Sequence, residues 1–93
     1  MFECDAAKAE ANRRKHGVPF EEAATLFANP FARIFPDPDH SSTEERELII
    51  GNSAENRLLM VLFTERAGSI RLISARLATR YELKDYEAGV ITR

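Results

Sequence analysis

The segment 51–76 constrains the fold of this chain more than any other part of the sequence. At its centre, 58–63 is a run of six apolar residues rich in strand formers, and such a run is typical of a strand that is covered on both faces. The glycine-containing connection 67–69 follows, and a second strand pattern begins at Ile70. The pattern predicts a rigid β-hairpin in the second half of the chain.

Four arginines are set into this hairpin or lie at the ends of its strands: Arg57, Arg66, Arg71 and Arg76. A guanidinium carries five donors in a fixed fork that matches a phosphate, so these residues are candidates for phosphate recognition. The alternative is that their stems only cover apolar surface. Because we expect Arg66 near the turn and Arg76 at the far end, one site holds both only if the substrate is long or the sheet is curved. Internal ion pairs on these arginines, or the lack of a groove between them, would argue against the phosphate interpretation.

The remaining pattern predicts an α+β fold. Ninety-three residues suffice for one core, so we expect a single domain over 1–93. The expected elements are a strand at 1–4, a helix at 6–15 between the caps Asp5 and Gly17, a helix at 20–28, strands at 31–35 and 44–52, the hairpin, and a last helix that opens at the capping box of Thr79 and Glu82 and ends at Gly89. The order is β-α-α-β-β-β-β-α, and its short connections predict a mainly antiparallel sheet with two helices before it and one after it.

Composition excludes several classes of protein. The net charge of −2 argues against non-specific nucleic-acid binding, although 1–47 is acidic and 48–93 is basic, and a local basic face can outweigh the total. A single cysteine, Cys4, excludes an internal disulfide, and neither a cysteine pair nor a His-x-x-x-His motif is present, so we expect no metal site and no cofactor. Because no stretch is long and apolar enough to span a membrane and no signal peptide pattern is present, we expect a cytoplasmic protein.

Two further groups of side chains carry the residue types of catalysis. Lys15 and His16 end the first expected helix, where His16 is either a capping imidazole or a group available for proton transfer. The adjacent Asp39, His40 and Ser41 have the residue types of a hydrolase triad. Successive side chains on an extended loop point apart, so a Pro- and Asp-rich turn explains this second group more simply than nucleophilic catalysis.

Motifs along about nine-tenths of the chain resemble those of the BrnT family of bacterial toxins. They are Phe2-Glu3-x-Asp5-x-x-Lys8, Asn12-x-x-Lys15-His16-Gly17-Val18-x-Phe20-Glu21-Glu22-Ala23, Phe27-Ala28-Asn29-Pro30, Asp39-His40-Ser41, Glu44-Glu45-Arg46, Ile50-Gly51-x-Ser53, Arg57-Leu58-Leu59, Thr64-Glu65-Arg66, Ile70-Arg71-x-Ile73-Ser74-Ala75-Arg76 and Tyr86-Glu87. The sequence departs from the family pattern at Cys4, where tryptophan is usual, and at Pro19, where serine or threonine is usual.

This resemblance implies a RelE-like fold and a ribonuclease that cleaves RNA without a metal and blocks translation. It also implies a partner, a BrnA-like ribbon-helix-helix antitoxin, through which alone the toxin would meet DNA. On that basis Arg66 and Arg76 are expected to bind the phosphate and stabilise the transition state, with Lys15 and His16 in proton transfer or substrate orientation.

The residues expected to contact RNA outside the reacting centre are Arg57, Arg71 and Tyr81. Two alternatives stay open. One is an inactive, toxin-like binding module that acts with an antitoxin as a transcriptional co-repressor, because Cys4 removes an aromatic ring that could stack on a base. The other is a hydrolase that uses His40 and Ser41.

Overall fold

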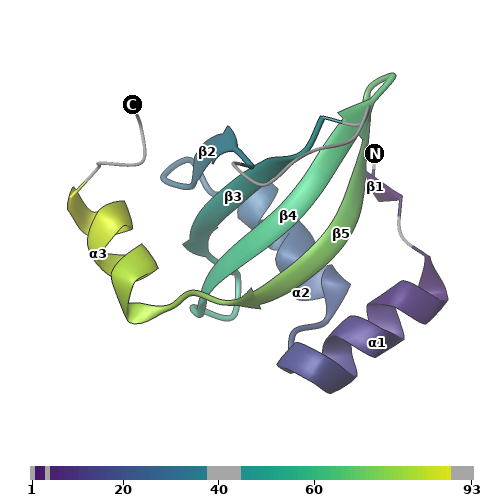
Figure 1. Ribbon diagram of the computed structural model, residues 1–93, viewed down its shortest axis with the longest axis horizontal. Coiled ribbons are helices and arrows are strands. Elements are labelled where there is room, and N and C mark those ends of the chain that lie inside the picture. Colours follow the sequence, from purple (N-terminus) through teal and green to yellow (C-terminus); the bar gives the residue numbers. More distant parts are fainter. Residues whose placement is uncertain (1, 4, 38–44, 89–93) are drawn as a thin grey trace.

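The computed structural model describes residues 2–3, 5–37 and 45–88. Its elements are β1 (Phe2–Glu3), α1 (Ala6–His16), α2 (Phe20–Ala24), the 3₁₀ helix η1 (Thr25–Ala28), β2 (Arg33–Pro36), β3 (Glu47–Asn52), β4 (Leu58–Arg66), β5 (Ser69–Leu77) and α3 (Arg80–Ala88) (Figure 1). The element order and the α+β class agree with the sequence prediction. None of the helices in the described ranges is long and apolar enough to cross a membrane.

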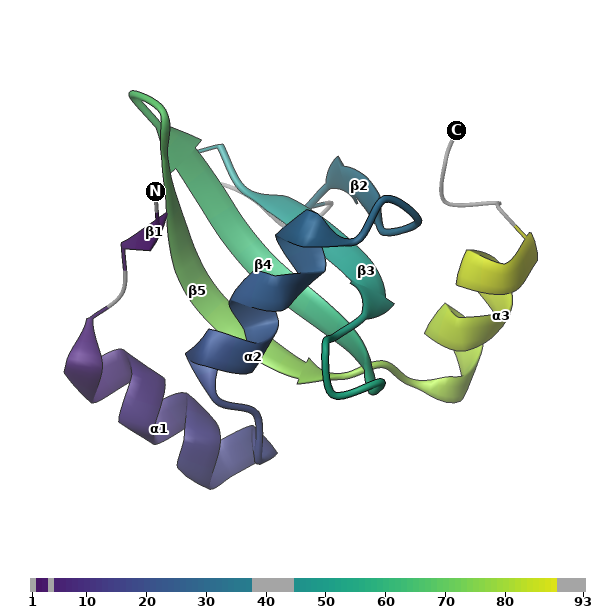
Figure 2. The same ribbon diagram turned by 180° about the vertical axis from the view of Figure 1, so that it is seen from behind.

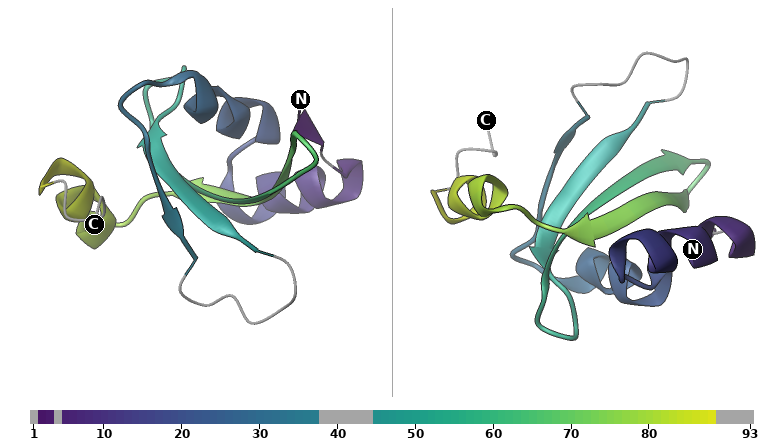
Figure 3. Two further views of the ribbon diagram at one scale, coloured as in Figure 1. Left: turned by 90° about the horizontal axis from the view of Figure 1, so that it is seen from above. Right: turned by 60° about the horizontal axis from the view of Figure 1, so that its bottom comes forward.

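The strands form one five-stranded sheet in the order β1-β5-β4-β3-β2. The three pairings from β5 to β2 are antiparallel, and only β1 joins β5 in parallel. Helices α1 and α2 lie together against one face of the sheet (Figure 2). Helix α3 stands beyond the end of β5 and away from the other two helices (Figure 3). The prediction of a mainly antiparallel sheet is therefore confirmed.

The hairpin of β4 and β5 contains a tight turn and one irregularity. Ala67 and Gly68 both have positive φ, +53° and +82°, which is the signature of a two-residue turn whose twist matches that of the strands. Phe63 pairs with Leu72 and Leu62 pairs with Ser74, so the register skips Ile73. This β-bulge shifts the alternation of side chains along β5.

The core lies between the sheet and the two N-terminal helices. Phe20 and Ala23 of α2 and Leu26 of η1 are buried against Leu59, Val61 and Phe63, the alternate residues of β4. Apolar residues at helical spacing, Phe20, Ala23, Ala24 and Phe27, predict the helix at 20–28. Phe20 and Ala23 are buried and Ala24 and Phe27 are partly buried, but the α-helix ends at Ala24 and continues as a 3₁₀ turn in which Leu26 is buried.

Asn12 closes the outer edge of the sheet along β5. Its side-chain amide donates to the Ala75 carbonyl at 2.8 Å, and its carbonyl accepts from the Ala75 N–H at 3.0 Å, as a neighbouring strand would. The same amide nitrogen donates to the Val18 carbonyl at 3.0 Å. The Asn12 side chain is buried, and its polar atoms are satisfied by these bonds.

The predicted ends of the first helix are confirmed, and those of several other elements change. Asp5 accepts from the amides of Ala7 and Lys8, and Gly17 follows α1 with a φ of +72°. Strand β3 ends at Asn52, as predicted, and Gly51 lies inside it, where an added Cβ would come within 2.8 Å of the Ala32 side chain.

Strands β2 and β3 begin at residues 33 and 47, later than the predicted residues 31 and 44. Cys4, the 39–41 segment and the predicted cap Gly89 lie outside the described residues.

The replacement Asn12→Ala tests the closure of the sheet edge. We expect the free energy of unfolding to fall by about 2–3 kcal/mol, because the Ala75 N–H and two carbonyls lose their partner in a buried place. Urea denaturation measures this change. Lys8→Ala, at an exposed site of the same helix, is the control and should change stability by less than about 0.5 kcal/mol. Equal stabilities of the two variants would contradict this account of Asn12.

Candidate functional site

Three of the predicted arginines share one face of the sheet. The side chains of the sheet that point away from α1 and α2 form what we term the outer face. Leu59, Val61 and Phe63 of β4 point into the core, so the alternate residues of that strand belong to the outer face. Their partners in the register place Arg76 opposite Met60, Arg71 opposite Thr64, and Arg66 opposite Ser69.

Arg66 and Arg71 line one cavity of about 310 Å³ at the turn end of the hairpin, which we term the hairpin pocket. The other lining residues are Glu3, Thr64, Ala67 and Ser69. Two guanidinium groups and the Ser69 hydroxyl at one place can attract and bind an anion. The Thr64 hydroxyl donates to the Glu45 carbonyl at 2.6 Å, which ties residue 45 to the outer face. The hairpin pocket is therefore suited to a phosphate group.

Arg76 lies farther along β5 and forms an ion pair within the chain. Its Nη1 and Nη2 donate to the two carboxylate oxygens of Glu82 at 2.8 and 2.7 Å. The Arg76 guanidinium holds the pKa of Glu82 down to about 2, although burial acts in the opposite direction. Glu82 also accepts from the Thr79 N–H at 2.7 Å, so the predicted capping box is present. The same glutamate therefore caps the helix and binds Arg76. An internal ion pair of this kind argues against the phosphate interpretation of the sequence, and it counts against the predicted role of Arg76.

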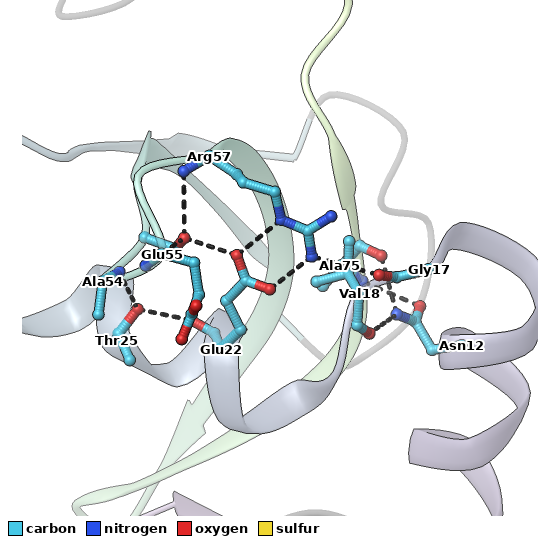
Figure 4. A network of polar contacts seen from close by, with 10 residues as sticks. Asn12, Gly17, Val18, Glu22, Thr25, Ala54, Glu55, Arg57 and Ala75 are labelled. Atoms are coloured by element: carbon cyan, nitrogen blue, oxygen red, sulfur yellow. Dashed lines mark hydrogen bonds and ion pairs between the residues drawn. The ribbon is translucent and has the colours of Figure 1, made fainter.

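Arg57 belongs to a different cluster on the helix side of the sheet (Figure 4). Its Nε donates to Glu22 Oε2 at 2.9 Å, and its Nη2 donates both to Glu22 Oε1 and to the Gly17 carbonyl. The Ser53 hydroxyl donates to Glu22 Oε2 at 2.6 Å. We term these four residues the Glu22 clamp. It joins the end of α1, the first turn of α2 and the connection between β3 and β4.

The electrostatics of the Glu22 clamp indicate that it stabilises the fold. The Glu22 side chain is only 6% exposed, and a buried carboxylate needs such partners to remain charged. Hydrogen bonds from Arg57 lower the pKa of Glu22, while burial opposes them and Ser53 reinforces them. Arg57, which was predicted to contact RNA, is thus separated from the outer face, and its guanidinium is bound to Glu22.

A second cavity, of about 700 Å³, lies beside the Glu22 clamp. Its lining residues are Gly17, Pro19, Glu21, Glu22, Thr25, Glu55 and Arg57. Three glutamates against one arginine give this cavity a negative balance, which repels a polyanion. This cavity is larger than the hairpin pocket, but its charge does not suit RNA, so we base the candidate site on the hairpin pocket.

The remaining predicted residues lie apart from the hairpin pocket. Lys15 and His16 end α1, which packs on the helix side of the sheet (Figure 2). Tyr81 is 82% exposed on α3. Sequence reasoning missed Glu3, Thr64 and Ser69 as neighbours of the arginines. The pairing of Thr64 with Arg71 follows from the turn at 67–68. Nothing in the sequence near residue 3 indicates that β1 pairs with β5 in parallel. Among the described residues, no group of three or more His, Cys, Asp or Glu side chains is placed to hold a metal ion.

The Glu22 clamp and the hairpin pocket predict opposite consequences for two arginine replacements. Arg57→Ala should lower the free energy of unfolding by about 2–4 kcal/mol, because it leaves the Glu22 carboxylate buried without its charged partner. Arg66→Ala, at an exposed position, should cost less than about 1 kcal/mol. Urea denaturation of the two variants measures the difference. Similar losses would show that Glu22 does not depend on Arg57.

Stability should fall in acid because both paired glutamates have a lowered pKa in the folded state. Such groups stabilise the fold above the ordinary glutamate pKa of about 4.3, and this stabilisation is lost as the pH falls toward the folded value. For Glu82 the loss should therefore extend from about pH 5 to about pH 2. Thermal unfolding of wild type and Glu82→Gln across this range measures it. The two curves should converge in acid, and parallel curves would contradict the assignment.

Comparisons with known proteins agree with this architecture. Residues 4–82 match the family model described as "Ribonuclease toxin, BrnT, of type II toxin-antitoxin system". The structure is similar to the 1.1 Å crystal structure of the Brucella abortus ribonuclease toxin BrnT, with a TM-score of 0.66 and 24% sequence identity over 86% of this chain and 99% of that chain. A comparison with curated proteins finds no match. The chain therefore belongs to the BrnT family, the ribonuclease toxins of type II toxin–antitoxin systems.

Proposed function

We propose that this protein is an endoribonuclease toxin that cleaves RNA on the outer face of β4 and β5 without a metal and thereby blocks translation. One observation carries the proposal: the register brings Arg66, Arg71 and Arg76 to a single face, and two of them line a pocket together with hydroxyl groups. Membership in a ribonuclease toxin family supports the same chemistry.

The reaction that fits this site uses the nucleophile of the RNA itself. The 2′-hydroxyl attacks the neighbouring phosphorus, and the bond from that phosphorus to the 5′-oxygen of the next nucleotide breaks, which leaves a 2′,3′-cyclic phosphate and a free 5′-hydroxyl. The reaction requires alignment of the two groups, removal of the proton from the 2′-hydroxyl, delivery of a proton to the leaving 5′-oxygen and stabilisation of charge on the phosphoryl oxygens. Arg66 and Arg71 supply charged donors to a phosphate in the hairpin pocket, and Arg76 supplies further positive charge along the same strand. Glu3 is the carboxylate of the pocket lining, and it is placed to accept the proton of the 2′-hydroxyl.

The other predicted residues have supporting roles in this proposal. Lys15 and His16 lie at the end of α1 on the helix side, which favours substrate orientation over proton transfer in the hairpin pocket. The exposed ring of Tyr81 is available for stacking on a base. Arg57 serves the Glu22 clamp, so its contact with RNA is the least supported of the predicted interactions.

The family also implies an antitoxin. We propose that this partner is a BrnA-like ribbon-helix-helix protein that binds the outer face and competes with RNA for its arginines, in the cytoplasm. Contact with DNA would then run through the antitoxin alone. A strand added to the β2 edge of the sheet is the alternative mode of binding.

A second candidate function is an inactive binding module that acts with the antitoxin as a co-repressor. The internal ion pairs of Arg57 and Arg76 favour it, because each occupies donors that RNA would otherwise use. Expression of the chain alone in bacteria separates the two functions. Growth arrest with cleaved RNA supports the ribonuclease, whereas normal growth with intact antitoxin binding supports the module.

Replacement of the pocket arginines tests the ribonuclease directly. Arg66→Ala and Arg71→Ala should each lower kcat/KM for an RNA oligonucleotide roughly 10²-fold or more, because each removes charged donors from the phosphate. Glu3→Gln should lower the rate at saturating RNA and leave affinity nearly unchanged. Cleavage assays with EDTA present measure these effects and test metal independence.

Lys84→Ala, at an exposed site on α3, is the matched control for lost positive charge and should cleave at the wild-type rate. If the arginine variants fold normally and also cleave at that rate, the hairpin pocket is not the site of reaction.

A further inference from the structure

The donors of Arg76 are only partly used by its contacts within the chain. A guanidinium has five N–H donors: two on Nη1, two on Nη2 and one on Nε. Nη1 donates to Glu82 Oε1 and to the Leu77 carbonyl, and Nη2 donates to Glu82 Oε2. In the described part of the chain, Nε and the second hydrogen of Nη2 have no partner, and these two donors form a second, parallel fork.

This second fork has access to solvent. The Arg76 side chain is 39% exposed. Nε of Arg76 makes no hydrogen bond in the described part of the chain, and it is not among the fully buried side-chain atoms there that lack one, so solvent can reach it. A phosphate can take the Nε–Nη2 edge in the bidentate manner while Glu82 keeps the Nη1–Nη2 edge.

The carboxylate of Glu82 is itself held from two sides. Arg76 binds both of its oxygens, and the Thr79 N–H donates to Oε1 at 2.7 Å. The Glu82 N–H in turn donates to the Thr79 hydroxyl at 3.2 Å, which completes the capping box at the start of α3. At the other end of the helix the Tyr86 hydroxyl donates to the Phe31 carbonyl at 3.1 Å. Helix α3, which buries no side chain, is thus fastened to the body at both ends.

We propose that Glu82 is a positioning residue that fixes the plane of the Arg76 guanidinium and turns its Nε–Nη2 edge toward an RNA phosphate. The inference rests on the proposed ribonuclease function. Arg76 pairs with Met60 and lies outside the hairpin pocket, so its fork holds a neighbouring phosphate and aligns the RNA strand for reaction in that pocket. The paired carboxylate, by contrast, lowers the net positive charge that attracts RNA. Loss of Glu82 therefore affects the rate of cleavage and the affinity in different ways, and a purely structural residue would not separate them.

The variants Glu82→Ala and Glu82→Gln test the proposal. The rate of single-turnover cleavage at saturating RNA should fall roughly ten-fold or more in Glu82→Ala, because Arg76 keeps its charge and loses its orientation. The Kd for an oligonucleotide with a 2′-deoxy residue at the cleaved position should stay equal or tighten. Glu82→Gln keeps one acceptor and the capping contact, so its rate should be intermediate.

A double-mutant cycle with Arg76→Ala separates positioning from general loss of structure. If Glu82 acts through Arg76, Glu82→Ala should cause no further loss of rate in an Arg76→Ala background. An equal loss in both backgrounds would overturn the proposal. Faster cleavage or a rate equal to wild type in Glu82→Ala would also overturn it, and faster cleavage would identify Glu82 as a competitor of RNA. Lys84→Ala serves as the control on the same helix.

NMR of the Arg76 Nε–H distinguishes failure of this inference from failure of the ribonuclease function. In the wild-type protein this signal should be sharp and should shift when the 2′-deoxy oligonucleotide binds, and Glu82→Ala should broaden it. A sharp signal that is unchanged by Glu82→Ala would overturn the positioning role whether or not the protein cleaves RNA. Absence of cleavage with the expected NMR response would instead refute only the ribonuclease function.

Discussion

The skipped residue Ile73 determines which arginines of β5 can act together. Side chains of a regular strand alternate between faces, so Arg71 and Arg76, five positions apart, would point to opposite faces of the sheet. The bulge takes one residue out of the alternation and places both arginines on the outer face. Without it, one of the two would point toward the apolar core beside α2, where burial of a guanidinium without a polar partner costs free energy.

The outer face also depends on how the opposite face is filled. The apolar side chains of α2 and η1 cover the alternate residues of β4, and Asn12 closes the free edge of β5 with its amide group. The Glu22 clamp then fixes the connection that leads into β4. Catalytic groups need support of this kind, because a misplacement of about 1 Å costs much of the rate. Strands β4 and β5, which form the hairpin pocket, are thus supported along their length by these contacts.

Local sequence patterns were sufficient for most of the fold. The caps Asp5 and Gly17, the apolar periodicity of 20–28 and the box of Thr79 and Glu82 act within a few residues, so they can be identified in the sequence. Contacts between distant segments could not be predicted in this way. Nothing near Asn12 or Glu22 in the sequence indicates that one side chain replaces a strand and the other binds Arg57, because both partners are more than 30 positions away. The bulge at Ile73 has no signal in its residue types.

The ion pairs of Arg57 and Arg76 show why pairing alone does not decide the role of an arginine. Both residues donate two bonds to a glutamate and a third to a backbone carbonyl. Arg57 uses its Nε–Nη2 edge for Glu22, and its Gly17 contact ties it to the end of α1, on the helix side. Arg76 uses its Nη1–Nη2 edge for Glu82, and this leaves the Nε–Nη2 edge for a phosphate on the outer face. The choice of edge, rather than the presence of a salt bridge, distinguishes Arg57, whose Nε–Nη2 edge is used within the fold, from Arg76, whose Nε–Nη2 edge stays open for the proposed contact with RNA.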